Sequence, residues 1–361
     1  MQILDKESLK NISQEATQLL IKLIETPSFS KEESGTALII ESFFASKNIP
    51  TKRKQNNIWA YNQYFDPGKP TLLLNSHHDT VRPNTSWTLD PFSAMMEDGK
   101  LYGLGSNDAG GCLVSLIHTF VYFYDRKDLK YNIIIAATAE EEISGKEGLE
   151  IVVPELPEID FAIVGEPTEM HLAVAEKGLL VLDCKAIGRS GHAARDEGDN
   201  AIYKALQDII WITNYQFPKV SPTLGPVKMS VTIINAGSQH NVVPDACTFT
   251  IDVRATDQYT LEEIIEEIQK NIQSEISPRS IRLRPSSIPI EHPIVRAGIA
   301  LGRNTYGSPT TSDQALLDCP SLKMGPGHSG RSHSADEFIY LHEIEGGIAQ
   351  YIEMLEAVMV S

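Results

Sequence analysis

Cysteine is scarce in this sequence, and its spacing argues against a disulfide-stabilised fold. Four cysteines occur among 361 residues: Cys112, Cys184, Cys247 and Cys319. They are widely scattered, and none forms a Cys-x-x-Cys pair. Spacing of this kind predicts buried, reduced thiols of a cytosolic protein.

Long apolar runs and an excess of basic residues are missing as well. No run approaches the roughly 20 apolar residues that span a bilayer, and the opening residues MQILDKESLK lack the apolar core of a signal peptide. The 48 acidic residues outnumber the 31 basic ones, which gives a net charge of −17. Because nucleic acids and anionic membranes repel such a chain, we expect neither as a partner, and we expect a soluble protein of the cytoplasm.

The length and the order of the predicted elements indicate two domains. A chain of 361 residues is longer than one hydrophobic core usually supports. Its apolar residues, 42% of the total, are ample for burial. Strands and helices alternate from an opening helix, which ends near Pro27, to about Glu176, and this is the order of a layered α/β fold. From about Pro289 the chain returns to this first domain and ends in a helix.

The middle of the chain follows a different order. Its predicted elements are a strand over residues 179–187, a helix over 200–213, strands over 227–235 and 247–254, a helix that begins near Leu261, and a short strand over 281–283. This β-α-β-β-α-β order is that of a ferredoxin-like unit. We therefore expect a three-layer α/β/α domain with a mainly parallel sheet from residues 1–177 and 289–361, and an inserted ferredoxin-like α+β domain from residues 178–288.

Three apolar segments lead into carboxylate or imidazole side chains. They are TLLLNSHHD (Thr71–Asp79), which ends in His77, His78 and Asp79; YNIIIAAT (Tyr131–Thr138), before Glu140, Glu141 and Glu142; and FAIV (Phe161–Val164), before Glu166. The apolar runs are typical of strands buried on both faces of a parallel sheet. Ligands of such sheets bind at the carboxyl ends of the strands. The segments therefore predict a site that gathers metal ligands.

Two glycine-rich loops add further ligand types. GLGSNDAGG (Gly103–Gly111) holds one carboxylate, Asp108, directly before an amphipathic helix, and GPGHSGRSHSADEF (Gly325–Phe338) holds His328, His333, Asp336 and Glu337. A lone histidine is more often structural and an acidic run is more often solvated, so the hypothesis depends on their joint arrangement. Nitrogen and oxygen ligands without thiolates suit zinc, cobalt or manganese in a catalytic site.

Taken in order, these motifs resemble those of the zinc-dependent deacylases and peptidases that include acetylornithine deacetylase, succinyl-diaminopimelate desuccinylase and aminoacylases. The resemblance covers nearly the whole chain and rests on SHHDTV, GLGSNDAGG, TAEEE, VGEPT, the region of His192, NVVPD with the following DVR, and SHSADEF. It implies the two-domain architecture described above. It also implies a centre of two divalent metal ions, most often zinc, with cobalt or manganese as alternatives.

The resemblance assigns the ligands residue by residue. His77 would bind one metal ion, His333 would bind the other, and Asp108 would bridge both. Glu142 and Glu166 would complete the two sites.

Two further carboxylates would support the chemistry. Asp79 would hold the His77 imidazole in the right tautomer, and Glu141 would be the general base. The family usually has an Asp-Glu-Glu order at this point. A shift of these roles by one residue among Glu140, Glu141 and Glu142 therefore stays open.

The chain departs from the family pattern in one loop. The residues after Asp108 read Ala109-Gly110-Gly111 where Met-Lys-Gly-Gly is common, which removes a charge but no ligand. We interpret His78 as structural or as a support of the ligands. His328 has two interpretations, a solvated loop side chain or a substrate contact.

Three residues of the inserted domain are candidate substrate contacts. By resemblance, His192 would stabilise the oxyanion, often from the partner subunit, and Asn241 and Arg254 would bind the carboxylate of the substrate. A ferredoxin-like unit has an exposed edge strand, and pairing two such edges forms a closed two-fold dimer. We therefore expect a homodimer.

These residues together predict a dinuclear metal-dependent hydrolase that removes an N-acyl group from an amino acid. The segment CPSLKMGPG, with the His-x-x-Asp-Glu that follows it, is similar to the acetylornithine deacetylases. This favours N-acetyl or N-succinyl derivatives of ornithine or citrulline in arginine biosynthesis. A dipeptidase or aminopeptidase with the same ligands stays an alternative, and so does a non-catalytic metal-binding relative.

Overall fold

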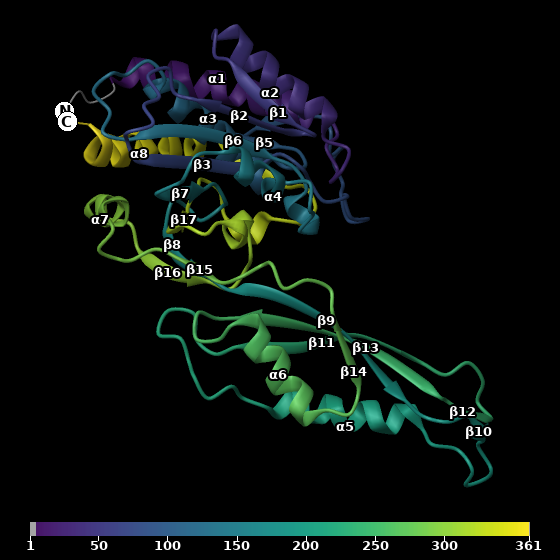
Figure 1. Ribbon diagram of the computed structural model, residues 1–361. Coiled ribbons are helices and arrows are strands. Elements are labelled where there is room, and N and C mark those ends of the chain that lie inside the picture. The colour runs from purple at the N-terminus through teal and green to yellow at the C-terminus, as the bar shows by residue number, and fades with distance from the viewer. Residues whose placement is uncertain (1–4, 361) are drawn as a thin grey trace. The chain divides into compact units, whose positions relative to one another are not determined.

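A computed structural model describes residues 5–360 (Figure 1). The chain divides into two compact units. Unit 1 consists of the chain up to Val174, Ser287–Tyr306, and the chain from Ser312 onward. Unit 2 consists of Ala175–Ser286 and Gly307–Thr311.

A mixed sheet forms the centre of unit 1. Its strands are β1 (Thr51–Lys54), β2 (Asn57–Tyr61), β3 (Thr71–His77), β6 (Asn132–Thr138), β7 (Phe161–Val164), β8 (Leu172–Glu176), β15 (Ser286–Ser287), β16 (Thr305–Ser308) and β17 (Ser321–Lys323). The order is β1-β2-β6-β3-β7-β17-β8-β15, and β16 also pairs with β8. The central pairs β6–β3, β3–β7 and β7–β17 are parallel, whereas β1–β2, β2–β6 and β17–β8 are antiparallel.

Helices and a second, smaller sheet surround these strands. The helices are α1 (Lys6–Ile24), α2 (Ser34–Ser46), α3 (Gly111–Phe123), α4 (Leu149–Val152), α7 (Pro293–Ala300) and α8 (Leu341–Met359). The small sheet consists of β4 (Met95–Glu97), β5 (Lys100–Tyr102) and β18 (Phe338–Tyr340). Asp5 caps α1, because its side chain accepts hydrogen bonds from the N–H groups of Glu7 and Ser8.

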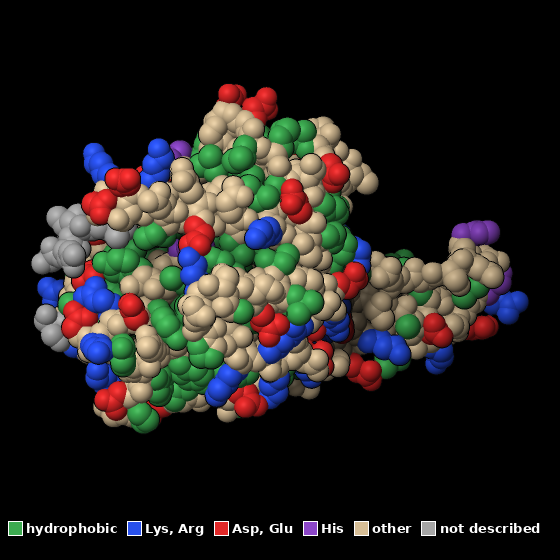
Figure 2. Space-filling model, turned by 90° about the horizontal axis from the view of Figure 1, so that it is seen from above, with side chains coloured by type: hydrophobic (Ala, Val, Ile, Leu, Met, Phe, Trp, Pro, Cys, Tyr) green, Lys and Arg blue, Asp and Glu red, His purple; other side chains and the backbone are tan. Residues whose placement is uncertain are grey.

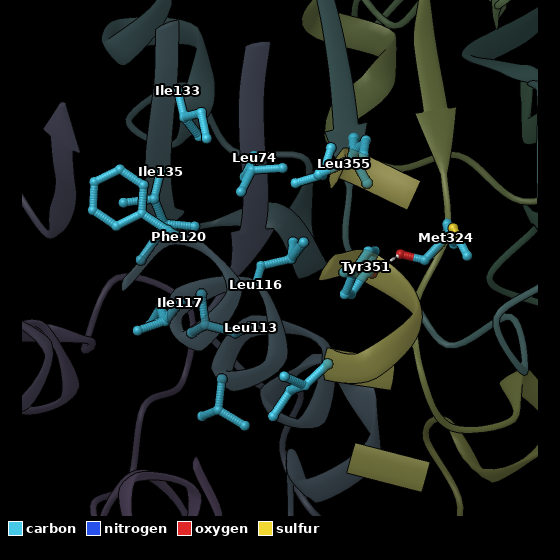
Figure 3. Packing of buried hydrophobic residues seen from close by; sticks show 14 of the residues in the cluster. Leu74, Leu113, Leu116, Ile117, Phe120, Ile133, Ile135, Met324, Tyr351 and Leu355 are labelled. Carbon is cyan, nitrogen blue, oxygen red and sulfur yellow. Dashed lines mark hydrogen bonds between the residues drawn. The ribbon is translucent and has the colours of Figure 1, made fainter. Parts of the chain in front are cut away.

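The main core lies between one face of the sheet and α1, α3 and α8. Figure 3 shows how side chains of α3, β3, β6 and α8 point toward one another there; they include Leu74, Leu113, Leu116, Ile117, Phe120, Ile133, Ile135 and Leu355. The hydroxyl group of Tyr351 on α8 donates to the carbonyl oxygen of Met324. A buried tyrosine usually needs such a partner.

The opposite face of the sheet has its own, smaller core. Strand residues alternate between the faces, so Leu72 and Leu74 join the main core, whereas Leu73 packs with Leu149 and Val152 of α4. All seven residues of β3 are buried. The expected α/β fold, with a mainly parallel sheet between helices, is confirmed.

Unit 2 has the ferredoxin-like order of elements. These are β9 (Gly178–Ile187), α5 (Ala201–Asn214), β11 (Lys228–Ala236), β13 (Ala246–Ala255), α6 (Leu261–Asn271) and β14 (Glu275–Pro278). They form an antiparallel sheet in the order β11-β13-β9-β14. A separate two-stranded ladder joins β10 (Gly191–His192) to β12 (Val242–Val243).

One face of this sheet carries the core of unit 2. Leu180, Leu182 and Cys184 of β9 and Phe249, Ile251 and Val253 of β13 pack with α5 and α6. The residues between them face the other way, because side chains alternate along a strand. That second face is mainly polar: it carries Asp183, Lys185, Thr248, Thr250, Asp252 and Arg254.

The last strand of unit 2 is not where the sequence predicts it. Residues 281–283 are irregular, and the strand is β14 (Glu275–Pro278), which pairs with Lys185–Leu182 of β9. The prediction of 281–283 as a strand is therefore wrong. It rested on two apolar residues of a short segment, and pairing with β9 starts only four residues after α6 ends at Asn271.

The surface mixes charges of both signs. On the face shown in Figure 2, acidic and basic side chains are interspersed with apolar ones. Within residues 5–360, no helix combines the length and the apolar character that crossing a bilayer requires.

Candidate metal centre

The parallel strands deliver three of the predicted ligand segments to one edge of the sheet. His77 is the last residue of β3 and lies beside Thr138, the last residue of β6. β7 is in register on the other side of β3, with Val164 beside Asn75. Glu141 and Glu142 therefore follow β6, and Glu166 follows β7, at the same edge as His77.

The loop that carries Asp108 needs glycine for steric reasons. Gly105 has φ +76°, a left-handed conformation that favours glycine. A Cβ atom on Gly110 would lie 2.4 Å from the carbonyl oxygen of Gly105. The close turn directs Asp108 toward the edge of the sheet, and the peptide bond between Asp108 and Ala109 is cis.

The buried His77 imidazole faces three carboxylates. Its Nε2 atom lies 3.4 Å from Oδ1 of Asp108, 3.7 Å from Oε1 of Glu166 and 4.0 Å from Oε2 of Glu141. Its Nδ1 atom lies 3.0 Å from the carbonyl oxygen of Asp79.

His333 approaches the same aspartate from the opposite side. Its Nε2 atom lies 2.9 Å from Oε2 of Glu142 and 3.6 Å from Oδ2 of Asp108. Asp108 thus presents one oxygen to His77 and the other to His333. This is the arrangement of a carboxylate between two sites.

Asp79 connects His77 to the turn that carries Glu141 and Glu142. Its carboxylate accepts hydrogen bonds from the N–H groups of Glu141 (3.1 Å) and Glu142 (3.2 Å), and from the Ser30 hydroxyl (2.7 Å). Its Oδ1 atom lies 3.4 Å from Nδ1 of His77. One buried carboxylate therefore holds both the imidazole and the turn that follows β6.

Glu140 lies in the same acidic triplet but points elsewhere. It has a left-handed backbone, with φ 57°. Its carboxylate accepts a hydrogen bond from the N–H group of Glu147 at 3.3 Å. Glu141 and Glu142 are the two members of the triplet whose carboxylates reach the histidines.

Burial makes ionised carboxylates unfavourable in this cluster. Burial raises the pKa of Glu166 to about 8 and that of Glu141 well above its ordinary value. Burial opposes protonation of His77, but the carboxylates of Asp108 and Asp79 outweigh it and raise the imidazole pKa well above the ordinary value. A cation among these carboxylates would offset this cost of burial.

A divalent cation fits this set of donors. Both oxygens near Nδ1 of His77 are acceptors, so Nδ1 carries the proton and Nε2 presents a lone pair. Among the residues described, this buried Nε2 atom has no hydrogen-bond partner. Two overlapping groups, His77 with Asp108 and Glu142 and His77 with Glu141 and Glu166, each have ligand atoms within 4.8 Å of one another.

Glu337 supports the cluster in a role that the sequence did not predict. Its buried carboxylate accepts hydrogen bonds from the N–H groups of Gly105 (3.2 Å), Asn107 (2.8 Å) and Asp108 (2.9 Å). It lies four residues after His333. One loop therefore supplies the candidate ligand His333 and also fixes the loop that carries Asp108. A pairing across some 230 residues leaves no local signal in a single sequence.

Asn107 joins the same two loops a second time. Its side chain donates to the carbonyl oxygen of His328 at 3.2 Å and accepts from the N–H group of His328 at 3.0 Å. The His328 imidazole is half-exposed and lies 3.7 Å from Oε2 of Glu169. His328 therefore contributes its main chain to the loop contact, while its ring stays outside the cluster.

Asp313 is a second buried carboxylate that the sequence did not predict. Its Oδ2 atom accepts a hydrogen bond from the Thr138 hydroxyl at 2.7 Å, at the end of β6. Burial raises the pKa of Asp313 to about 6. It adds to the negative charge around His77 without facing that imidazole directly.

His78 is structural. Its Nδ1 atom lies 2.8 Å from the Thr36 hydroxyl, and its Nε2 atom lies 2.9 Å from the carbonyl oxygen of Asn56. Burial lowers its pKa to about 4. Both nitrogens are engaged away from the cluster, so the ring is not available to a metal ion.

His192, Asn241 and Arg254 all lie in unit 2. β10 and β12 bring the first two together, because the N–H group of Ala193 donates to the carbonyl oxygen of Asn241 at 3.0 Å. The Arg254 guanidinium forms two hydrogen bonds to Asp252, at 2.9 and 3.1 Å. The structure thus describes these three residues by their contacts within unit 2.

Comparison with known proteins shows to which family this chain belongs. The sequence model of the family described as "Peptidase family M20/M25/M40" matches residues 73–357. An acetylornithine deacetylase of Proteus mirabilis is 29% identical over 366 residues, covering 91% of this chain and 92% of its own. A succinyl-diaminopimelate desuccinylase of Wolbachia pipientis wMel is 27% identical over 373 residues, covering 94% and 92%.

Solved structures share the fold. An M20 family metallo-carboxypeptidase from Sulfolobus solfataricus superposes with a TM-score of 0.77 at 17% identity, covering 95% of this chain and 99% of that one. A dinuclear metal binding peptidase of the M20 family from Bacillus subtilis superposes with a TM-score of 0.74 at 17% identity, covering 97% and 98%. The chain therefore belongs to peptidase family M20/M25/M40 and is a hydrolase that acts on amide bonds.

Proposed function

We propose that the protein removes an N-acyl group from an amino acid, and that it releases ornithine or citrulline in arginine biosynthesis. The observation that carries the proposal is the pair of histidines, His77 and His333, on opposite oxygens of Asp108, with Glu141 beside them. Similarity to an acetylornithine deacetylase along 91% of the chain supports the class of substrate. The expected location is the cytoplasm.

Five residues of unit 1 would hold two divalent metal ions. His77 and Glu166 would bind one ion, His333 and Glu142 would bind the other, and Asp108 lies between them with one oxygen toward each histidine. Zinc suits this set of nitrogen and oxygen donors, and cobalt or manganese are alternatives. When bound, such a pair lowers the pKa of a water molecule and polarises a carbonyl group.

Glu141 is the general base. Its Oε2 atom takes a proton from the attacking water and returns it to the leaving nitrogen of the amide. The hydrogen bond from its main chain to Asp79 holds it beside the ligands. Asp79 also keeps the proton of His77 on Nδ1, which leaves Nε2 free to bind metal.

The substrate contacts come from two subunits. His192 lies beyond the Ile187 end of β9, whereas Arg254 pairs with Leu179 at the other end. At about 3.3 Å per residue, the strand from residue 179 to residue 187 spans about 26 Å. His192 of one copy and Arg254 of another therefore serve one substrate more easily than both residues of the same copy.

An exposed apolar surface on unit 2 supports the homodimer. Tyr203, Leu206 and Ile210 follow helical spacing on α5 and are 67%, 51% and 53% exposed. Ile233 and Ile234 of the edge strand β11 are 48% and 55% exposed. A second copy that covers α5 and pairs with β11 would bury this surface and remove the open edge.

A panel of substrates tests the proposal. The purified protein is treated with a chelator, reloaded with zinc, cobalt or manganese, and given N-acetylornithine, N-acetylcitrulline, their N-succinyl forms and a set of dipeptides. We expect hydrolysis of an N-acyl ornithine or citrulline that depends on the added metal. Preference for dipeptides would favour a peptidase of the same family. Two bound metals without any turnover would favour a non-catalytic relative, although such a protein has no physical need for Glu141.

A further inference from the structure

The two histidines of the candidate metal centre are held in different ways. His77 is the last residue of the buried strand β3 and is 1% exposed. The His333 side chain is 56% exposed, and its backbone is left-handed, with φ 57°. This conformation is uncommon outside glycine and persists only where surrounding contacts enforce it. The sheet therefore fixes His77, whereas His333 needs another support.

Arg331, two residues before His333, has the contacts that such a support requires. Its guanidinium donates to both carboxylate oxygens of Glu343, in the first turn of α8, at 2.7 and 2.9 Å. Both side chains are 17% exposed, so water and salt screen this ion pair less than they screen a pair at the surface. Two parallel hydrogen bonds fix the direction of the guanidinium as well as its distance.

Two aromatic rings of β18 fix the same guanidinium a second time. Its central carbon lies 4.8 Å from the ring centroid of Phe338 and 5.1 Å from that of Tyr340. A guanidinium over an aromatic face is attracted by the electrons of the ring. Glu343 belongs to the same assembly, because it also accepts a hydrogen bond from the N–H group of Tyr340 at 2.9 Å. Arg331 is thus anchored where β18 meets α8.

The main chain of Arg331 transmits this constraint to His333. The Arg331 N–H group donates to the carbonyl oxygen of His328 at 3.0 Å, and the Arg331 carbonyl oxygen accepts from the Ser334 hydroxyl at 2.7 Å. The second bond closes a turn over residues 331–334, and this turn contains His333. A shift of the turn would move the imidazole away from the carboxylates that it faces.

We propose that Arg331 is the positioning residue of His333, and that it sets the affinity of one metal site without touching the metal ion. The inference rests on the proposed function, which supplies the metal centre, and goes beyond it by giving a role to a residue outside the ligand set. Glu337 acts elsewhere, because its hydrogen bonds go to the loop that carries Asp108. Arg331 thus acts on the His333 site alone.

Metal titration of matched variants tests the proposal. The metal-free wild type, Arg331→Met, Arg331→Lys and the control Arg126→Met are titrated with zinc against an indicator. Arg126 is matched because it forms an ion pair with Glu356 near the other end of α8, at 2.8 Å and with 26% exposure. We expect Arg331→Met to weaken the binding of one zinc ion about 10–100-fold, as is typical of residues that orient a ligand. The other ion, and both ions in the control, should bind as in the wild type.

Two further readouts separate positioning from general stability. Arg331→Lys keeps the charge but loses the two parallel hydrogen bonds, so it should recover only part of the lost affinity. With cobalt in place of zinc, the visible absorption depends on the ligand geometry. It should change for one ion in Arg331→Met and for neither ion in Arg126→Met.

A double-mutant cycle shows whether Arg331 acts through His333. In a His333→Ala background, Arg331→Met should cause no further loss of metal affinity. The same loss in that background, or equal weakening of both ions in the His333-containing protein, overturns the proposal. Metal binding is measured without substrate, so the result holds whichever amide the protein hydrolyses. If Arg331→Met fails to fold, Arg331→Lys is carried through the same cycle.

Discussion

The nine-stranded sheet of unit 1 and the four-stranded sheet of unit 2 place their polar groups in different ways. The central strands of unit 1 are buried along their length, and their functional side chains appear only where the strands end, as at His77 after β3. The sheet of unit 2 has one apolar face and one polar face, and its charged residues lie along the strands, as Asp252 and Arg254 do.

The difference follows from what covers each sheet. Helices and turns pack on both faces of the sheet in unit 1, so a polar side chain in mid-strand would be buried without water. Helices cover one face of unit 2, so every second residue of a strand is available to a ligand. We therefore expect changes in unit 1 to remove metal or turnover, and changes in unit 2 to alter substrate binding or turnover while the metal stays.

The largest effect is expected at Asp108. Its two oxygens face His77 and His333, so Asp108→Ala should weaken both metal sites together and abolish turnover. Metal analysis after dialysis against a fixed zinc concentration measures this, with Asp313→Asn as a control for loss of a nearby buried carboxylate. Loss of one ion with the other unchanged would make Asp108 a ligand of a single site.

Glu141→Gln comes next. The change keeps the size of the side chain and removes the proton acceptor, so turnover should fall about 10²–10⁴-fold while both metal ions stay bound. Glu140→Gln is the matched control, because the carboxylate of Glu140 accepts a hydrogen bond from Glu147 instead of facing the cluster. If Glu141→Gln instead lost metal and recovered activity in added zinc, Glu141 would be a metal ligand and not the base.

His192→Ala should reduce turnover about 10²–10³-fold, the typical cost of one oxyanion donor, without changing metal content. Mixing this variant with Glu141→Gln tests whether His192 acts across a dimer. If it does, a heterodimer contains one site with both residues intact, and part of the activity returns. No recovery after verified subunit exchange would place His192 in its own subunit or outside catalysis.

The smallest effect is expected at Glu337. Glu337→Ala removes the acceptor for three N–H groups of the Asp108 loop, so metal affinity should fall about 10–100-fold, as for other residues that orient a ligand. Competition with a zinc indicator gives the affinity. Asp336→Ala is the control, because its carboxylate binds Thr88 and Leu89 at the surface. Equal losses in the two variants would indicate a general effect of the loop.

Much of the fold was predictable because its signals are local. Apolar runs mark β3, β6 and β7, and helical spacing marks α3, α5 and α6. The strand predicted at 281–283 failed, because its apolar residues are few and its position depends on pairing with β9. For the site, the sequence predicted the candidate ligands but not the roles of Asp313 and Glu337, because these roles depend on contacts with distant segments.

The sequence by itself determined which residue types stand at the ends of the buried strands, because an apolar run that stops at a histidine or a glutamate is visible in a single chain. Only the tertiary structure decided that Asp108 presents separate oxygens to His77 and His333, and that Glu337 supports the Asp108 loop. The physical reason is that strand register and loop pairing depend on hydrogen bonds between segments far apart in the sequence. Such contacts form only when the chain is folded.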